Sequence, residues 1–339
     1  MRSVVLTSAR WGHFATPRNG RLVRLHEHPD FRALVARVAA EQKLPEWWIE
    51  KDYYLTEILR TCASSYPEQS VLKGGTSLSK GWALIDRISE DIDVFFDPHS
   101  TVPSLGKNAV DHAFKVIAEA SAQIPGLALI NGSTVKRGGS SRTDTFRYEK
   151  LFPDLASPAP TIILESGIQS GRRPEEKRRI SSYVGRSLEA GGQAELAEDV
   201  RGFDMHTMHY TRTFVEKLFT IHGKVQRFLN DGTTIGRDAR HYVDLDLLAQ
   251  RDDVRAMLSG AGYADMRNDY DAISREFYPK TYRPPDDLRF HDSPALFPDD
   301  ALRRELSRSY EVDVPPLFLG QPPEFGDVLR RLTEIRELL

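Results

Sequence analysis

The amino-acid sequence predicts an α/β (α+β) protein with a mixed N-terminal lobe and a helical C-terminal lobe. Between about residues 30 and 204, short strand-like apolar runs alternate with helical patterns. From about residue 205, apolar residues recur at three- and four-residue steps. The 339 residues, 40% hydrophobic and 28% charged, can fill two such lobes. We therefore divide the chain into an irregular arm (1–29), an α/β lobe (30–204) and a helical lobe (205–339).

Local signals support each element of this division. Asp30 is a good N-cap before an apolar helical face, and Pro45 opens a second helix. In chain order we expect helices from Asp30 and from Pro45, a strand at 70–73, a helix start at 76–84, a strand at 91–96, a helix at 107–121, strands at 144–148 and 161–166, helices at 213–228 and 239–248, and a terminal helix near 328–335. A proline-rich passage at 282–298 precedes the last helix.

Composition limits the possible functions. A net charge of −3 provides no general attraction for nucleic acid, so a polyanion would need a local basic patch. Cys62 is the single cysteine, which excludes an intrachain disulfide and a cysteine zinc cage, and its apolar surroundings predict a buried structural thiol. No run approaches the roughly 18 apolar residues of a membrane span, and the N-terminus does not resemble a signal peptide. We expect a soluble, cytoplasmic protein without a membrane partner.

A double-glycine turn lies where the strand at 70–73 gives way to a helix. Gly74 and Gly75 are followed by Thr76, Ser77 and Lys80. Glycines allow the backbone to approach a ligand closely, and a helix N-terminus is partly positive, so this segment could hold phosphate oxygens. Many Gly-Gly turns bind nothing, and that alternative stays open for this motif alone.

Two aspartates follow shortly after the turn. Asp91 and Asp93 are two apart in an expected strand, so they share one face, while Ile92 and Val94 face the core. Adjacent carboxylates repel unless a cation lies between them, and Mg²⁺ prefers such oxygen ligands. The alternative is a solvated acidic turn. The apolar run that continues from Val94 favours a metal site on a buried strand.

Glu165 is a lone carboxylate in the otherwise apolar strand at 161–166. Burying it without a partner would be costly, so it should face a cleft, a cation or a metal. It could accept a proton from an attacking hydroxyl or complete a metal shell. A glutamate that reaches water at the end of a strand is the competing interpretation.

The C-terminal lobe adds a second group of charges. Lys217 lies mid-helix among apolar neighbours, where a lysine whose stem lies along the apolar surface is the simple explanation. Arg240 and Asp244 are four apart on one helix, a spacing that permits an intrahelical ion pair. We interpret His241 as a surface or packing residue.

Four motifs resemble the AbiEii/MenT nucleotidyltransferase toxins, a branch of the DNA-polymerase-β-like superfamily. They are Ile49-Glu-Lys-Asp-Tyr-Tyr-Leu-Thr, Leu72-Lys-Gly-Gly-Thr-Ser-Leu-Ser-Lys, Ile88-Ser-Glu-Asp-Ile-Asp-Val, and Glu216-Lys217 taken with Arg240-His-Tyr-Val-Asp244. Together they cover about residues 45–250. Residues 255–339 match nothing in this resemblance and receive no expected role.

The resemblance implies a small mixed sheet flanked by helices, with the helical lobe closing over a nucleoside triphosphate. At matching positions it implies Mg²⁺ on Asp91 and Asp93, and Lys217 on the nucleotide phosphates. It further implies that Asp244 fixes Lys217 or the nucleotide, with Glu165 as a third carboxylate. The residues implied along the triphosphate are Gly74, Gly75, Thr76, Ser77 and Lys80. A lysine at position 80, where family members often have arginine, lacks the bidentate fork.

The resemblance also implies the acceptor, the 3′ end of tRNA, whose modification blocks translation, and a cognate antitoxin, with a winged-helix regulator as a candidate. A positive groove for RNA could come from Arg172, Arg173, Lys177, Arg178 and Arg179, with Arg137 and Arg142 nearby. A solvated basic face is the simpler interpretation of that cluster. The same chemistry could instead modify a protein hydroxyl or a small molecule. A non-catalytic nucleotide-binding partner or antitoxin would be expected to lack the intact pair of aspartates.

Overall fold

The structure, a computed structural model, describes residues 23–85, 91–152, 159–318 and 320–339. Eight strands form one mixed sheet in the order β3-β5-β6-β2-β1-β8-β7, with β4 paired to β5. The strands are β1 (Ser70–Lys73), β2 (Asp91–Phe96), β3 (Leu127–Leu129), β4 (Val135–Arg137), β5 (Ser141–Tyr148), β6 (Thr161–Gly167), β7 (Glu175–Ile180) and β8 (Phe203–Met208). Central β2 is antiparallel to β1 and parallel to β6. The expected mixed α/β architecture is confirmed.

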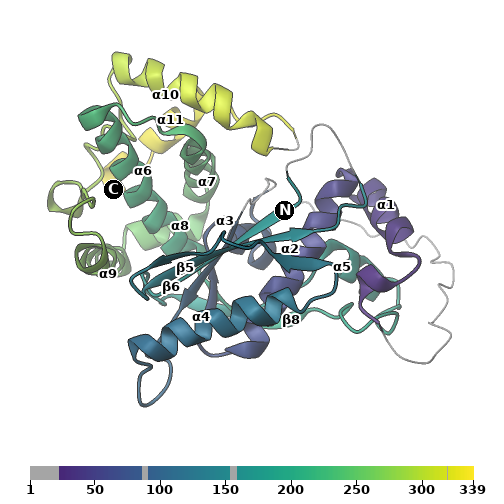
Figure 1. The fold of residues 1–339 in the computed structure, drawn as a ribbon. Coiled ribbons are helices and arrows are strands. Elements are labelled where there is room, and N and C mark those ends of the chain that lie inside the picture. Colours follow the sequence, from purple (N-terminus) through teal and green to yellow (C-terminus); the bar gives the residue numbers. More distant parts are fainter. Residues whose placement is uncertain (1–22, 86–90, 153–158, 319) are drawn as a thin grey trace.

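Helices flank this sheet and make up most of the chain after β8. They are α1 (Phe31–Gln42), α2 (Glu46–Ser65), α3 (Gly74–Thr76), α4 (Lys107–Ala122), α5 (Tyr183–Ala190), α6 (Tyr210–Asp231), α7 (Arg240–Ala249), α8 (Asp252–Leu258), α9 (Ala261–Phe277), α10 (Asp300–Asp313) and α11 (Phe325–Thr333). Figure 1 shows the later helices gathered on one side of the sheet, with α1, α2 and α5 toward the other. Apart from the segment at 76–84, the helices predicted from hydrophobic periodicity are all present.

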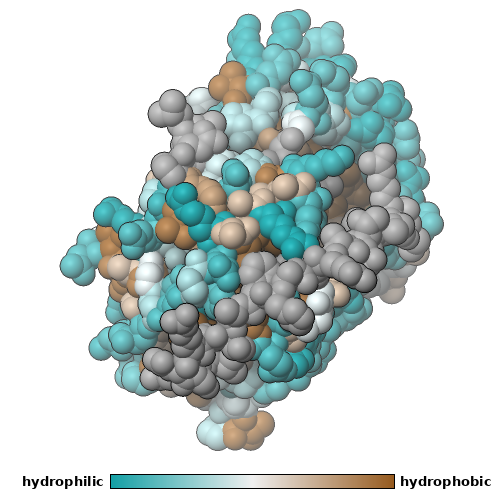
Figure 2. Space-filling model, turned by 90° about the vertical axis from the view of Figure 1, so that its right-hand side faces the viewer, coloured by the Kyte–Doolittle hydropathy of each residue, from teal (hydrophilic) through white to brown (hydrophobic). Residues whose placement is uncertain are grey.

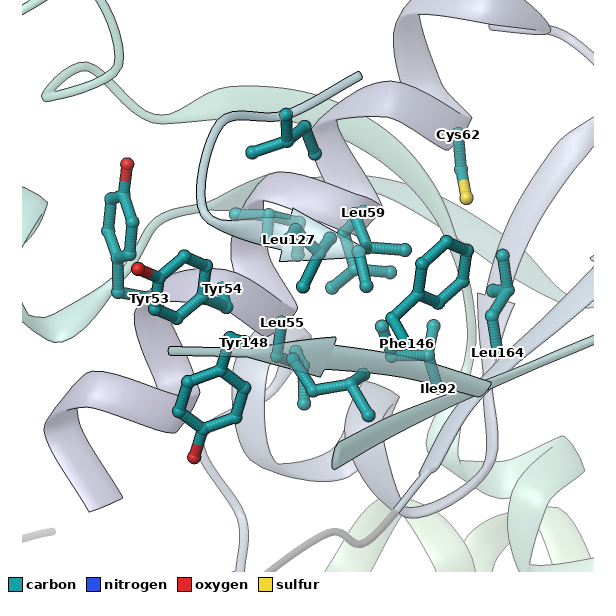
Figure 3. Packing of buried hydrophobic residues seen from close by; sticks show 14 of the residues in the cluster. Tyr53, Tyr54, Leu55, Leu59, Cys62, Ile92, Leu127, Phe146, Tyr148 and Leu164 are labelled. Carbon is teal, nitrogen blue, oxygen red and sulfur yellow. The ribbon is translucent and has the colours of Figure 1, made fainter. Parts of the chain in front are cut away.

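One face of the sheet forms the first hydrophobic core. Alternate strand residues such as Ile92, Phe146 and Leu164 are fully or almost fully buried against the helices α1, α2, α4 and α5. Figure 3 shows Leu59 of α2 beside these three side chains. Because the side chains of a strand alternate between faces, the opposite face of β2 is left to Asp91 and Asp93.

The helices from α6 onward enclose a second hydrophobic core. Phe214, Leu218 and Tyr242 belong to it, and so does Leu78, which comes from the segment directly after the double-glycine turn. The segment that follows strand β1 is therefore anchored in the helical lobe. This anchoring fixes the turn between the two lobes.

Two parts of the chain differ from the sequence-based expectations. The expected helix at 76–84 is replaced by the three-residue α3 and a π-helical turn, Ser77–Gly81, which rotates the side chains that follow. The pattern that appeared helical from about 205 begins with strand β8, and α6 starts at Tyr210. Most of the irregular arm, residues 1–22, lies outside the described residues, and Leu25–Glu27 forms a 3-10 turn.

The described surface on the side that carries α1 and α5 is mostly hydrophilic, with apolar side chains in small separate areas (Figure 2). Cys62 is fully buried, and burial raises the pKa of its thiol to about 12, so the expectation of a structural thiol is confirmed. Among the described residues, no helix combines the length and the apolar character needed to cross a bilayer.

Candidate functional site

Strand β2 presents two carboxylates away from the first core. Ile92 and Val94 are at most 1% exposed, whereas Asp91 and Asp93 are half-buried on the opposite face. Register places Asp93 beside Lys73 of β1 and beside Glu165 of β6. Facing residues on adjacent strands share a face of the sheet, so Lys73, Asp93 and Glu165 form one row. The expected projection of the two aspartates to one side is confirmed.

The double-glycine turn packs directly on this row. Gly74 has φ +66°, and a Cβ on it would lie 2.2 Å from Asp93 Oδ2. Thr76 Oγ1 donates a hydrogen bond to the Asp91 carbonyl oxygen at 2.5 Å, and Ser77 Oγ donates to the Gly74 carbonyl oxygen at 2.8 Å. The turn is therefore tied to β2, and its first glycine makes room for the carboxylate.

We expect Gly74→Ala to displace the Asp93 carboxylate. The nucleotide transfer that the motif resemblance implies should then fall by at least about tenfold, because a misplaced group at a reaction site is costly. Gly132→Ala is the matched control, since Gly132 also has a positive φ, +76°, but its Cβ would meet nothing within 4 Å. Both variants place a side chain at a positive φ and so strain the backbone. Only in Gly74→Ala does the added Cβ clash with Asp93. Comparing initial transfer rates and thermal unfolding midpoints separates the two effects; equal losses of transfer would contradict the role assigned to the clash.

Glu165 lies next to the two aspartates, and their charges affect its pKa. Desolvation first, and then repulsion from Asp93 and Asp91, raises its pKa, against the opposing attraction of Lys73 and Arg137. A carboxyl whose pKa is raised is a stronger base once it is ionised. The side chain is exposed and lines a cavity together with Lys73 and Asp93.

Lys73 and Glu216 form an ion pair across the lobe boundary that the sequence did not predict. Lys73 Nζ lies 3.7 Å from Glu216 Oε2. Burial opposes the charge on Lys73, but attraction from Glu216 and Asp93 outweighs it and raises the pKa of Lys73. Burial likewise opposes ionisation of Glu216, and Lys73 and Arg212 overcome it and lower the pKa of Glu216. Both groups are therefore charged beside the carboxylates.

Lys217 enters the site from α6 with a buried partner on α7. Its Nζ lies 2.8 Å from Asp244 Oδ2 and donates to His241 Nδ1 at 3.0 Å. Burial and the charge of Lys217 lower the pKa of His241 to about 3, so the imidazole is neutral. Lys217 is thus held by Asp244 rather than lying along an apolar surface, while Arg240 donates to the Arg237 carbonyl oxygen at 3.1 Å.

A cleft of about 190 Å³ joins these groups between the sheet and the helices α6 and α7. Its lining comprises Lys73, Gly74, Gly75, Asp91, Asp93, Thr213, Glu216, Lys217, Thr220, Arg240 and His241. A second cavity of about 170 Å³, which contains Glu165, adjoins it and shares Lys73 and Asp93. Glycines, aspartates and Lys217 from distant parts of the sequence therefore meet at one place.

The structure places three of the expected triphosphate residues elsewhere. Lys80 and Thr76 line a separate small cavity beside α2, where Lys80 Nζ forms an ion pair with Asp52. Ser77 is fully buried within the turn. The π-helical turn explains this, because its wider winding rotates Lys80 away from the carboxylates and toward α2. Burial, opposed by Asp52, lowers the pKa of Lys80. Lys80, for which the resemblance implied a place along the triphosphate, therefore does not line the cleft of Asp91 and Asp93.

The carboxylates fit a hard divalent cation. Asp91 and Asp93 lie two residues apart on one face of β2 and line the cleft together, so both can offer carboxylate oxygens to a cation there. Within the described ranges, no group of three histidine, cysteine, aspartate or glutamate residues is arranged to hold a metal. A Mg²⁺ ion here would be held by Asp91 and Asp93 and would share its other ligand positions with substrate phosphates and water.

The basic cluster near residue 175 is largely neutralised. Its members pair with acidic residues: Arg172 with Asp97 and Glu175, Arg173 with Glu175, Lys177 with Glu68, Arg178 with Glu176, and Arg179 with Glu189. Arg178–Arg179 lie on edge strand β7, whereas Arg137 and Arg142 lie on β4 and β5, toward the opposite edge of the sheet. The two basic groups therefore do not form the single groove that the sequence suggested.

Several residues in the cleft were missed by sequence reasoning. Lys73 and Glu216 belong to the motifs that carry the resemblance, where they directly precede Gly74 and Lys217. This adjacency to expected site residues is the sequence signal that could have predicted them. Thr213 and Thr220, three residues to either side of the Glu216–Lys217 step on α6, share the face that lines the cleft. Tyr278, from the stretch without an expected role, lines the second cavity.

Two sheet aspartates and a buried lysine therefore line one cleft beside a glycine turn. A family model described as nucleotidyl transferase AbiEii toxin, type IV TA system, matches residues 57–331. The chain belongs to this AbiEii toxin family, as its motifs predicted. No curated protein matches the chain.

Proposed function

We propose that this nucleotidyltransferase toxin transfers a nucleoside monophosphate from a nucleoside triphosphate to the 3′ end of tRNA in a Mg²⁺-dependent reaction, and thereby blocks translation. The observation that carries the proposal is that Asp91 and Asp93 of the sheet line one cleft with Lys217, which lies 2.8 Å from the buried Asp244. Glu165 lies beside Asp93 in the same row of the sheet. Membership of the AbiEii family supports the reaction class. The tRNA acceptor follows from the resemblance of the motifs to the AbiEii/MenT toxins.

The triphosphate would lie in the cleft that both lobes line. The Gly74 and Gly75 backbone permits close approach, and Lys217 and Arg240 supply positive charge from the opposite wall. Asp244 Oδ2 lies 2.8 Å from Lys217 Nζ and holds this side chain in place. Mg²⁺, when bound at Asp91 and Asp93, would supply charge neutralisation for the phosphates.

The remaining chemistry needs one proton acceptor. The acceptor hydroxyl oxygen forms a bond to the α-phosphorus, the bond from that phosphorus to the pyrophosphate oxygen breaks, and pyrophosphate leaves. Glu165, a neighbour of Asp93 in the row, takes the proton of the attacking hydroxyl. Its raised pKa suits this role, since a base that is too weak would not draw the proton away.

The raised pKa of Glu165 predicts a pH-dependent stability in the metal-free protein. Because the folded protein binds this proton more tightly than the unfolded chain does, stability is lost as the pH rises toward the raised pKa. We therefore expect Glu165→Gln to raise the thermal unfolding midpoint at pH 7.5 and to change it little at pH 4.5.

Glu68→Gln is the control of opposite sign for that experiment. A hydrogen bond to His206 and the charge of Lys177 lower the pKa of Glu68, so its ionised form favours the folded state. Its replacement should leave unchanged or slightly lower the midpoint at pH 7.5. A lower unfolding midpoint for Glu165→Gln at pH 7.5 would contradict the repulsion between Glu165 and the two aspartates.

The acceptor is tested with labelled nucleotides. The purified protein is incubated with bacterial RNA, a cell extract, Mg²⁺ and each of the four α-labelled nucleoside triphosphates in turn. We expect label from one or two of them on RNA of tRNA length, sensitive to RNase and resistant to protease. Protease-sensitive label would establish the alternative of a protein acceptor, and label on a small molecule would establish the third possibility.

Family membership implies a toxin–antitoxin system, and we propose that a cognate antitoxin restrains this activity in the cytoplasm. A regulator with a winged-helix fold is our candidate. Co-expression of the neighbouring open reading frame with the toxin should restore growth. A neighbour that leaves growth arrested and tRNA labelled is not the antitoxin.

A further inference from the structure

The second cavity is an extension of the cleft on the far side of Asp93. It shares Lys73 and Asp93 with the cleft, and its other lining residues come from β2, β4, β5, β6, the segment after β6 and the residue after α9. Register continues the polar row into it, because Thr143 of β5 pairs with Glu165, which pairs with Asp93. Asp93 therefore lies between two polar cavities. The cleft is the one in which we place the triphosphate.

The rim of this cavity carries a cation on a tight hairpin. Gly138 and Gly139 both have positive φ, +59° and +75°, and Ser140 N donates to the Arg137 carbonyl oxygen at 3.0 Å. These features describe a two-residue turn of the type that requires glycines. Arg137 at its start is exposed and, within the described parts of the chain, forms no ion pair, although its charge acts on both Glu165 and Tyr278.

The two other basic side chains that line the cavity, Lys73 and Arg142, both form ion pairs, and that of Lys73 is with Glu216 at 3.7 Å. Arg142 is buried, and its Nε lies 2.6 Å from Asp144 Oδ2. Lys136, next to Arg137 on β4, lies 3.3 Å from Asp111 Oδ1 of α4. Successive strand residues point to opposite sides, so Lys136 faces away from the cavity that Arg137 lines. Arg137 is therefore the cation of the hairpin that is positioned to receive an anionic group.

A hydrogen-bonded wall joins the hairpin to the helical lobe. Tyr278, the residue after α9, donates its hydroxyl to Gln169 Oε1, and Gln169 Nε2 donates to Ser140 Oγ at 2.9 Å. Tyr278 is half-buried, and burial raises the pKa of its phenol, so the hydroxyl remains a donor. The wall holds an aromatic ring, an amide and hydroxyls opposite Asp93, a set suited to a ribose and a base.

We propose that this cavity binds the 3′-terminal nucleotide of the RNA acceptor, with a ribose hydroxyl directed at Asp93 and the preceding phosphodiester on Arg137. This inference rests on the proposed nucleotidyl transfer. The terminal hydroxyl loses its proton to Glu165 and bonds to the α-phosphorus as pyrophosphate leaves toward the Lys217 side. The exposed cation favours a phosphodiester over a protein side chain, and the narrow space favours a single-stranded end.

The test compares Arg137→Ala with Lys136→Ala in the full-length protein. Each removes one positive charge from the same strand, and only Arg137 lines the cavity. The measurement is steady-state transfer from the preferred labelled nucleotide to a tRNA acceptor-stem minihelix, with KM for each substrate, at several KCl concentrations. Arg137→Lys is included as the conservative variant, which retains the charge.

We expect Arg137→Ala to raise the KM for the minihelix by about tenfold or more, since a charge-assisted contact is lost. The KM for the nucleotide should change less than about twofold, and the salt slope of log KM for the minihelix should fall by about 0.7. Arg137→Lys should recover much of the affinity, and Lys136→Ala should behave as the wild type. Preserved unfolding midpoints show that folding is intact.

Two results would overturn the inference while leaving the transfer reaction intact. One is an equal effect of Arg137→Ala and Lys136→Ala on the minihelix KM. The other is an Arg137→Ala effect confined to the nucleotide KM. A wild-type protein that labels protein instead of RNA, or labels nothing with any triphosphate, would overturn the proposed function itself and this subsite with it.

Discussion

Asp91→Asn and Asp93→Asn are each expected to lower nucleotide transfer by about a thousandfold or more, because each removes a ligand of the Mg²⁺ ion that we propose and with it several kcal/mol of charge stabilisation. The amide keeps the shape of each side chain but weakens its hold on a divalent cation. Growth arrest on expression should disappear with the activity. The measurement is the initial rate of label transfer to tRNA, together with colony formation under induction.

Folding provides an independent readout for these variants. Removing the charge at position 93 relieves repulsion with Glu165, so the unfolding midpoint of metal-free Asp93→Asn should stay within about 3 °C of the wild type. Added Mg²⁺ should raise the midpoint of the wild type more than that of the variant, since a ligand that binds the folded state stabilises it.

Asp204→Asn is the matched control for the aspartate variants. Asp204 is an exposed aspartate on β8 of the same sheet and lines none of the cavities described above. It should leave the rate, the toxicity and the Mg²⁺ response unchanged. Full transfer activity in a folded Asp91→Asn protein would contradict the proposed role of these carboxylates in holding Mg²⁺.

The second large effect is expected at the buried pair between α6 and α7. Lys217 is 5% exposed and Asp244 is fully buried, with 2.8 Å between Nζ and Oδ2. Lys217→Ala or Asp244→Ala leaves an uncompensated buried charge, which costs about 3–5 kcal/mol of folding free energy. Either change should also lower transfer by at least about a hundredfold, because an electrostatic contact to the phosphates is lost.

A double variant separates structure from chemistry at this pair. Lys217→Met with Asp244→Leu replaces both charges by apolar groups, so it should recover most of the stability that either single change removes. Transfer should stay at the level of Lys217→Ala. Denaturant unfolding and the transfer assay on the same preparations provide the two measurements.

Arg331 of α11 and Asp246 of α7 are the matched pair. Arg331 Nη2 lies 2.6 Å from Asp246 Oδ2, which is buried and faces away from the cleft. Arg331→Met with Asp246→Leu should alter stability while leaving transfer intact. If the Lys217–Asp244 double variant recovers transfer along with stability, the pair is structural. That result would contradict the role of Lys217 in binding the phosphates.

The sequence was sufficient for features that depend on short-range periodicity. Alternation along residues 91–96 determines which side chains reach the core, so the spacing of Asp91 and Asp93 is enough to place both on the outer face of the strand. Helical spacing likewise placed Lys217 on α6. These inferences need only the geometry of one element.

Features that depend on register or on unusual winding could not be read in this way. The row of Lys73, Asp93 and Glu165 requires the alignment of three strands that are far apart in the chain. Lys80 seemed suited to phosphate because of its motif, and the π-helical turn directs it to Asp52 instead. Strand β7, with charged residues on both faces, has no alternating apolar signal.

The two-sided construction of the cleft has a consequence for synthesis on the ribosome. The strand with both metal carboxylates emerges long before α6 and α7, which carry Lys217 and its counter-ion. A product released before α6 is complete therefore has an acidic row without the opposing lysine, and only half of the cleft. For a member of a toxin family, we therefore expect a product that ends before α7 to be inactive, and activity to require that α6 and α7 have packed against the sheet.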